Sequence, residues 1–289
     1  MIGLDRLKEL EPHATGIKGL LVPETGIIDY KRVAEAYAEK IRAAGGDIRT
    51  SHKVVGILEG KSEVVLQTSG GDYRTTYLIN CCGLYSDAVA KMMRTDDNTG
   101  SREEHRIIPF RGEYYKIAPE KHFLVRNLIY PVPDPTFPFL GVHFTRMISG
   151  SVEAGPNAIF AFAREGYRKT DINLGELWQT VSFKGFWAMT GKYWQTGFSE
   201  LYRSLSKSAF VKALQRLLPE ITDEDLIPGG AGVRAQAVSA AGALVDDFVI
   251  RQSRNAIHVL NAPSPGATAS LAIGQSIAEM AGKNFELKA

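Results

Sequence analysis

The residues best placed to do chemistry lie near the carboxyl end of the chain, at positions 257–274. A short apolar run ends there in a loop of proline, serine and glycine, and helix-favouring small residues follow the loop. This order predicts a helix that begins at about Pro265, because proline is tolerated in a first helical turn. The backbone N–H groups and positive end of such a helix favour a negatively charged group. An ordinary strand-to-helix connection would give the same pattern.

His143 is the leading candidate for a base in proton transfer. It alternates with Val142 and Phe144 in a strand-like stretch, so its side chain should lie on the opposite strand face from theirs. The ordinary imidazole pKa of about 6.5 suits proton abstraction at neutral pH. A histidine that is satisfied within the fold would fit the same pattern.

Composition restricts the class of protein. The chain has 289 residues, of which 44% are hydrophobic, so it can bury one large core or two smaller ones. A net charge of +2 without a basic run argues against nucleic-acid binding. Cys81 and Cys82 are adjacent in an apolar run, which predicts reduced, buried thiols and a cytoplasmic protein. The sequence contains no metal-ligand spacing, signal peptide or membrane span.

The order of elements predicts an interrupted α/β (α+β) fold. Mixed helices and strands at the two ends should form one discontinuous domain, 1–104 with 228–289, around an inserted antiparallel-sheet domain, 105–227. The first part should hold a helix at 31–44 that Asp29 caps and Gly45 and Gly46 end, then strands at 47–58, 64–68, 73–76 and 77–83 and a helix at 86–93. The later elements are strands at 106–117, 128–132, 139–147 and 151–162, helices across 174–217, strands at 245–250 and 256–260, and a helix at 265–282.

Several long motifs resemble one known family. They are VPETGIIDY at 22–30, PFRGEY at 109–114, IYPVPDP at 129–135, FPFLGVHFTR at 137–146, GPNA at 155–158, REGY at 164–167, GVRAQ at 232–236 and NAPSP at 261–265. With them the chain resembles the FAD-dependent oxidoreductases of the D-amino-acid-oxidase and glycine-oxidase type, over nearly its whole length. The resemblance implies a Rossmann-like FAD-binding domain and a sheet domain that binds the substrate.

The sequence departs from that family in one respect. Such flavoproteins begin with a strand, a G-x-G-x-x-G loop and a helix that hold the FAD pyrophosphate, and this pattern does not occur here. We therefore expect the FAD-binding domain to be incomplete at its amino end, with at least one βαβ unit upstream of Met1.

The resemblance assigns roles to particular residues. For the substrate it implies the carboxylate-binding Arg234, together with Arg111 and, more weakly, Arg146 and Arg164, while Tyr130, Tyr114 or Tyr115 could donate hydrogen bonds. Arg111 could instead form a structural ion pair with Glu113. For FAD it implies Val54 or Val55 at the adenine, Cys82 and Gly83 at the phosphates or ribose, and the loop of Pro263, Ser264, Pro265, Gly266, Ala267 and Thr268 at the pyrimidine end of the flavin. Core positions for the valines and a plain turn at Cys82 remain the alternatives.

The motifs look most like those of enzymes that oxidise L-2-hydroxyglutarate to 2-oxoglutarate by hydride transfer to FAD. This implies a small 2-hydroxy dicarboxylate as substrate, with arginines to bind it. It also implies a quinone of the respiratory chain as electron acceptor, and hence contact with the inner membrane surface. The alternatives are a related flavoprotein that oxidises an amino acid or glycerol 3-phosphate, and an inactive fragment that does not hold FAD.

Overall fold

A computed structural model of the chain describes residues 1–93, 105–132 and 141–287. The chain divides into two compact units. Unit 1 comprises Met1–Val33, Phe110–Asn173 and Thr190–Arg234, and unit 2 comprises Ala34–Pro109, Leu174–Met189 and Ala235–Ala289. Each unit is therefore assembled from chain segments that are distant in the sequence.

A largely antiparallel sheet forms the centre of unit 1. Its strand order is β10-β5-β8-β7-β6, and β9 pairs with β5. The tight turn expected at Ser149 and Gly150 joins β7 to β8, and Gly150 has the positive φ of 83° that such a turn requires. The strands are β5 (His105–Ile117), β6 (Leu128–Ile129), β7 (His143–Arg146), β8 (Val152–Gly155), β9 (Ile159–Phe160) and β10 (Leu226–Ser239).

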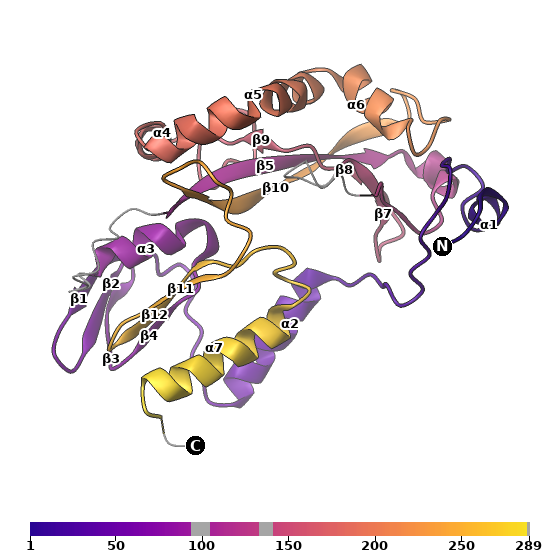
Figure 1. Ribbon diagram of the computed structural model, residues 1–289. Helices are drawn as coiled ribbons and strands as arrows, with labels where there is room; N and C mark the ends of the chain where they lie inside the picture. The colour runs from indigo at the N-terminus through magenta and orange to yellow at the C-terminus, as the bar shows by residue number, and fades with distance from the viewer. Residues whose placement is uncertain (94–104, 133–140, 288–289) are drawn as a thin grey trace. The chain divides into compact units, whose positions relative to one another are not determined.

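Helices cover one face of this sheet (Figure 1). Phe144, Val152 and Ala154 of the sheet are buried in one apolar cluster with Phe210 and Leu214 of α6 (Lys207–Leu214). The long helix α5 (Lys184–Leu205) precedes α6. The remaining short helices of the unit are α1 (Leu4–Leu10) and the 3-10 helix η2 (Pro119–Leu124). Because side chains alternate along a strand, the neighbours of the core residues lie on the opposite sheet face.

Unit 2 contains two small sheets. The strands β11 (Val249–Gln252), β12 (Ala256–Asn261) and β4 (Leu78–Asn80) form one, in which β12 and β4 are parallel. The meander β1 (Val54–Glu59), β2 (Val64–Thr68) and β3 (Gly71–Thr75) forms the other. Helix α3 (Ser86–Met92) packs between them through Val89, while α7 (Ser270–Asn284) packs on Ile257. The unit also contains the 3-10 helix η1 (Gly83–Tyr85) and helix α4 (Leu174–Val181).

Local signals set the bounds of α2 (Tyr30–Ala43) as predicted. Asp29 accepts hydrogen bonds from the backbone N–H groups of Lys31 and Arg32 at the start of the helix. At its end the N–H of Gly46 donates to the carbonyl of Ile41, and Gly45 has a φ of 82°.

Other predictions were wrong in detail. The last helix begins at Ser270 instead of Pro265, so the proline lies in the loop. Residues 151–162 form two strands, β8 and β9, and β10 was not predicted. Cys81 and Cys82 are free thiols as expected, but both are exposed, because β4 ends at Asn80. Residues 133–140, with parts of two motifs and the start of the predicted strand 139–147, lie outside the described residues.

Candidate functional site

His143 and Tyr130 lie together in unit 1. Their rings stack with centroids 4.2 Å apart and planes inclined by 19°. His143 Nδ1 lies 3.1 Å from the carbonyl oxygen of Gly141, which can only accept a hydrogen bond. Nδ1 is therefore the protonated nitrogen of the neutral ring, which leaves Nε2 as the basic one. Burial lowers the pKa of His143 below its ordinary value and outweighs the opposite effect of the Gly141 carbonyl.

The sheet face that carries His143 is the one opposite the helices. Phe144 points into the core, so His143 and Thr145 point away from it, as predicted from their alternation. The Tyr130 hydroxyl lies 3.4 Å from Thr145 Oγ1. Burial raises the pKa of Tyr114, and the nearby Glu153 and Tyr130 raise it further. Tyr115 instead packs on Phe210 in the core. This face thus gathers a base and two phenolic hydroxyls.

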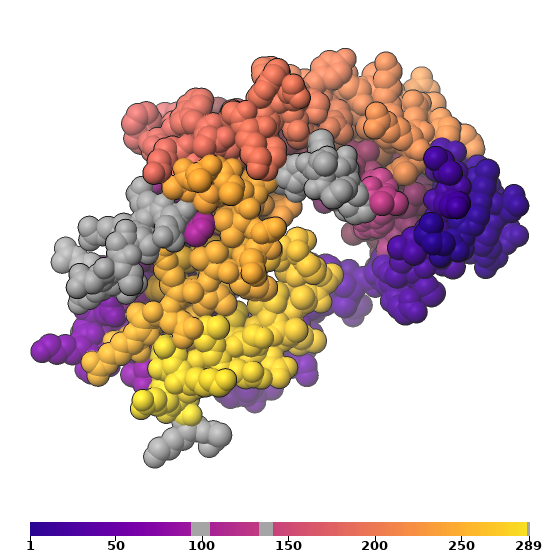
Figure 2. Space-filling view, in the orientation of Figure 1, coloured from indigo at the N-terminus to yellow at the C-terminus, as the bar shows by residue number. Residues whose placement is uncertain are grey.

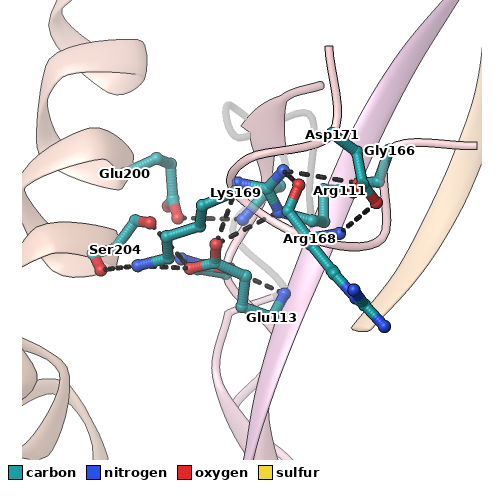
Figure 3. Close-up of polar contacts among 10 residues, drawn as sticks. Arg111, Glu113, Gly166, Arg168, Lys169, Asp171, Glu200 and Ser204 are labelled. Atoms are coloured by element: carbon teal, nitrogen blue, oxygen red, sulfur yellow. Dashed lines mark hydrogen bonds and ion pairs between the residues drawn. The ribbon is translucent and has the colours of Figure 1, made fainter. Parts of the chain in front are cut away.

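Arg111 lies on the helix-covered side of the sheet, where Figure 3 shows its contacts. It is 3% exposed, and its Nε and Nη2 each lie 3.1 Å from Glu113 Oε1. Its Nη1 donates to the carbonyls of Gly166 and Arg168. This arrangement is the structural ion pair that the sequence left open as the alternative, and it leaves the guanidinium surrounded by protein acceptors.

Arg146 is also held by protein oxygens. Its guanidinium donates to the backbone carbonyls of His122, Val125 and Gly150, with Nη2 2.7 Å from the His122 oxygen and Nη1 3.1 Å from the Gly150 oxygen. The side chain thereby ties η2 to the β7–β8 turn. These contacts favour a structural role over binding of a substrate carboxylate. Arg164, the weaker candidate, is 5% exposed.

Arg234 is more exposed than Arg111 and Arg146. It lies on β10 and is exposed, while desolvation lowers the pKa of its guanidinium. Strands β5 and β8 lie between β10 and β7 in the sheet, so the backbone does not make Arg234 a neighbour of His143. Of the sequence-predicted substrate residues that the structure describes, it brings His143 together with Tyr130 and Tyr114 on one face, and not with the arginines.

In unit 2, a sharp turn follows β4. Asn80 accepts a hydrogen bond from the N–H of Cys82, and its amide nitrogen lies 3.0 Å from Nδ1 of the buried His258 on β12. Gly83 has a φ of 52°, and a Cβ added to it would meet open space. The sequence pattern did not indicate Asn80 or His258 as site residues. They meet because β4 and β12 pair in parallel with Asn80 opposite His258.

The other cofactor candidates of unit 2 are exposed backbone segments. β1 is an edge strand of its sheet, and its pairing with β2 is irregular between Val54 and Gly56, at the exposed Val55. Pro263 to Thr268 form the loop before α7. Among the described residues, the N–H groups of Gly266, Ala267 and Thr268 have no hydrogen-bond partner. These groups therefore remain available as donors.

The chain belongs to the FAD-dependent oxidoreductase family, whose model matches residues 1–280. Named relatives extend this finding. The chain is 56% identical to "L-2-hydroxyglutarate dehydrogenase" of Indibacter alkaliphilus, over 98% of this chain and 70% of the relative. It is 43% identical to the Escherichia coli K12 protein of that name and 40% identical to the mitochondrial one of Homo sapiens, each matched over 64% of its own length.

Solved structures show the same fold. FAD-bound L-α-glycerophosphate oxidase of Mycoplasma pneumoniae has a TM-score of 0.66 at 18% identity, covering 99% of this chain and 64% of that one. Glycine oxidase of Geobacillus kaustophilus has a TM-score of 0.58 at 15% identity, over 98% of this chain and 62% of that one. The predicted family and fold class are therefore confirmed, and FAD is the cofactor of this family.

The residues of unit 2 fit an FAD molecule in part. The open space at Gly83 admits close approach of a phosphate or ribose, and the N–H groups at 266–268, which have no partner in the described part of the chain, suit an anionic acceptor. Within the described residues, no group of three His, Cys, Asp or Glu side chains could hold a metal ion. Nor does any described helix have the length and apolarity needed to cross a bilayer.

Proposed function

We propose that the chain takes part in the FAD-dependent oxidation of L-2-hydroxyglutarate to 2-oxoglutarate. The observation that carries this proposal is the set of relatives with that dehydrogenase name, which are 40–56% identical over nearly the whole chain. FAD, when bound, accepts the hydride from C2 of the substrate. The protein must then take the hydroxyl proton and bind two carboxylates.

His143 is the proposed base. The hydrogen bond from Nδ1 to Gly141 fixes the tautomer, so Nε2 can accept the hydroxyl proton as the carbonyl of the product forms. Its lowered pKa supports this role because the imidazole stays neutral at pH 7. Tyr130 restricts the ring by stacking on it, and Tyr114 and Tyr130 supply hydroxyl donors on the same face.

Arg234 is the proposed carboxylate-binding residue. Its exposure on β10 makes the guanidinium accessible to a substrate carboxylate, whereas Arg111 and Arg146 are enclosed by protein acceptors. A partly desolvated guanidinium interacts more strongly with a carboxylate than one in bulk water. We therefore assign Arg111 and Arg146 to the scaffold.

The proposed FAD contacts lie in unit 2. The N–H groups of Gly266, Ala267 and Thr268 would donate to the pyrimidine edge of the flavin, and Gly83 would admit a phosphate or ribose beside Cys82. The exposed edge of β1 at Val54 and Val55 would offer backbone groups to the adenine. For the electrons we propose a respiratory quinone as acceptor, which would bring the protein to a membrane surface.

Titration with FAD followed by substrate tests the function. We expect the flavin absorbance band to appear on the protein and to bleach when L-2-hydroxyglutarate is added without oxygen. Bleaching by an amino acid or by glycerol 3-phosphate, but not by L-2-hydroxyglutarate, would replace the proposed substrate. A folded chain that does not retain FAD would show that these residues alone do not hold the cofactor, and the oxidation would be ruled out for this chain.

A further inference from the structure

The polar side of helix α5 faces the sheet of unit 1. Thr196, Glu200 and Ser204 recur every four residues on its inner face, and the last two are buried. Ser204 Oγ donates to Glu113 Oε2 at 2.7 Å, and Glu200 Oε2 accepts the N–H of Ala158 at 3.1 Å (Figure 3). Hydrogen bonds therefore attach this helix to the sheet, where most surface helices use apolar side chains.

The opposite face of α5 is apolar and exposed. Its members recur at intervals of three and four residues, which places them on one side of the helix. We call this set the outer face of α5: Trp194, Phe198, Leu201, Tyr202 and Leu205, which are 54%, 67%, 45%, 65% and 73% exposed. In the space-filling view, α5 and α6 lie at the surface of the protein (Figure 2). A continuous aromatic and aliphatic surface of this kind marks an interaction site.

The exposed charged residues of α5 and α6 are of one sign. Residues 190–218 include five basic residues and a single acidic one, Glu200, which is buried and paired with Arg203. Lys192, Lys212 and Arg216 are exposed. Within 190–218 the exposed charged residues are therefore all basic, and they accompany an apolar surface that contains Trp194 and Tyr202. The acidic residues Glu220, Asp223 and Glu224 follow only after α6 ends.

This combination fits the surface of an anionic bilayer better than a second copy of the chain. Tryptophan and tyrosine favour the level of the lipid headgroups, and basic residues beside an apolar helix face attract anionic lipids. A twofold interface through the same patch would bring basic residues against basic residues, which opposes self-association.

We propose that the outer face of α5 is a docking surface for membranes that contain anionic phospholipids. The helix would lie in the plane of the interface, with its apolar face among the headgroups and upper acyl chains. The proposal deepens the membrane contact proposed above. Its test measures lipid binding without turnover, so it fails or succeeds independently of the substrate.

Flotation of the full chain with vesicles provides the test. We expect binding to phosphatidylcholine vesicles that contain phosphatidylglycerol, weaker binding to pure phosphatidylcholine, and loss at high salt. The double variant F198E/L205E should reduce binding about tenfold or more, because two apolar side chains that would enter the bilayer are replaced by anions. The matched control is I17E/I148E, which places the same charges at exposed positions of unit 1 outside α5.

A second readout does not depend on charged variants. In the variant W178F/W187F, Trp194 is the only tryptophan left, and brominated phospholipid should quench its fluorescence when vesicles bind. Absence of vesicle binding by the folded chain, or binding without quenching, would overturn the proposal. So would a concentration-dependent dimer that F198E/L205E abolishes while vesicles remain unbound, because the outer face would then join two copies.

Discussion

The ring of Tyr130 covers one face of the His143 imidazole at a centroid distance of 4.2 Å. The stack removes water from the histidine, and such desolvation is the main cause of its lowered pKa. A side chain just beyond β6 therefore contributes to the burial that keeps a side chain on β7 neutral. Tyr130 and His143 are thus the two candidate site residues in direct ring contact.

Removal of the tyrosine ring should raise the histidine pKa. In wild type, His143 should titrate below its ordinary value of about 6.5, so the acid limb of kcat/KM should also lie below that pH. Tyr130→Ala should move the His143 pKa upward toward 6.5, whereas Tyr130→Phe keeps the stack and should change it little. NMR titration of the imidazole protons measures this. Equal values in wild type and Tyr130→Ala would contradict the role of the stack.

Substitution of Arg234 should weaken substrate binding, whereas substitution of Arg146 should lower stability. Arg234→Lys should raise the KM for the dicarboxylate about tenfold, because lysine lacks the planar fork, and should cost less stability than Arg146→Lys because Arg234 is exposed. Arg146→Lys should lower the free energy of unfolding by about 2 kcal/mol through lost bonds to backbone carbonyls. Substrate kinetics and urea unfolding of both variants provide the comparison. A change in KM without a loss of stability in Arg146→Lys would contradict the structural role of Arg146.

Glu113 should be important for stability although it lies outside the proposed chemistry. Its carboxylate contacts Arg111, Asn157 and Ser204, and Arg111 is 3% exposed. Glu113→Gln leaves that guanidinium without its counter-charge, so we expect a loss of about 3 kcal/mol in denaturant unfolding. The control Glu63→Gln breaks an exposed pair with Arg74 and should cost less than about 1 kcal/mol. Equal losses would contradict a special role for the buried network.

Alanine substitutions at two glycines should have opposite effects. Gly83 has a φ of 52°, so Gly83→Ala should cost about 1 to 2 kcal/mol and weaken FAD binding. Gly274 lies within α7, where an added Cβ meets nothing within 4 Å, so Gly274→Ala should stabilise by about 0.5 to 1 kcal/mol. Thermal unfolding and FAD fluorescence titration test both. Unchanged FAD affinity in Gly83→Ala would remove this turn from the proposed cofactor site.

Acid should destabilise the chain through its buried histidines. Burial lowers the pKa values of His143 and His258, so below about pH 6.5 the unfolded chain binds protons that the folded chain does not. The free energy of unfolding should therefore fall as the pH falls through that value. His258→Gln should reduce this pH slope by up to about 1.4 kcal/mol per unit. Urea unfolding at several pH values measures the slope, and a slope unchanged by the substitution would exclude His258 as a source.

Elements with local start and stop signals could be predicted from the sequence. Asp29 and Gly45 set the two ends of α2 because capping depends on neighbouring residues only. The strand β10 was missed because Pro228 and several glycines interrupt its pattern, and such residues are unfavourable in isolated strands. Its pairing with β5, more than a hundred residues away, compensates for that weakness.

In the candidate site, too, features set by neighbouring residues could be predicted and features set by distant residues could not. Strand alternation gave the correct face for His143, since it depends only on Val142 and Phe144. The surroundings of Arg111 could not be predicted, because Gly166 and Arg168 reach it from a loop more than fifty residues further on. For α5, the sequence spacing defines two faces but does not say which one the sheet covers.

The pairing of β4 with β12 has a consequence for the way the chain must be made. Asn80 meets His258, 178 residues later, so β4 leaves the ribosome long before its partner strand exists. At about 5 to 20 residues per second, that interval lasts on the order of ten seconds or more. During this time the apolar strand and the two thiols after it are exposed to other proteins. Unit 2 is therefore expected to depend on chaperones during synthesis.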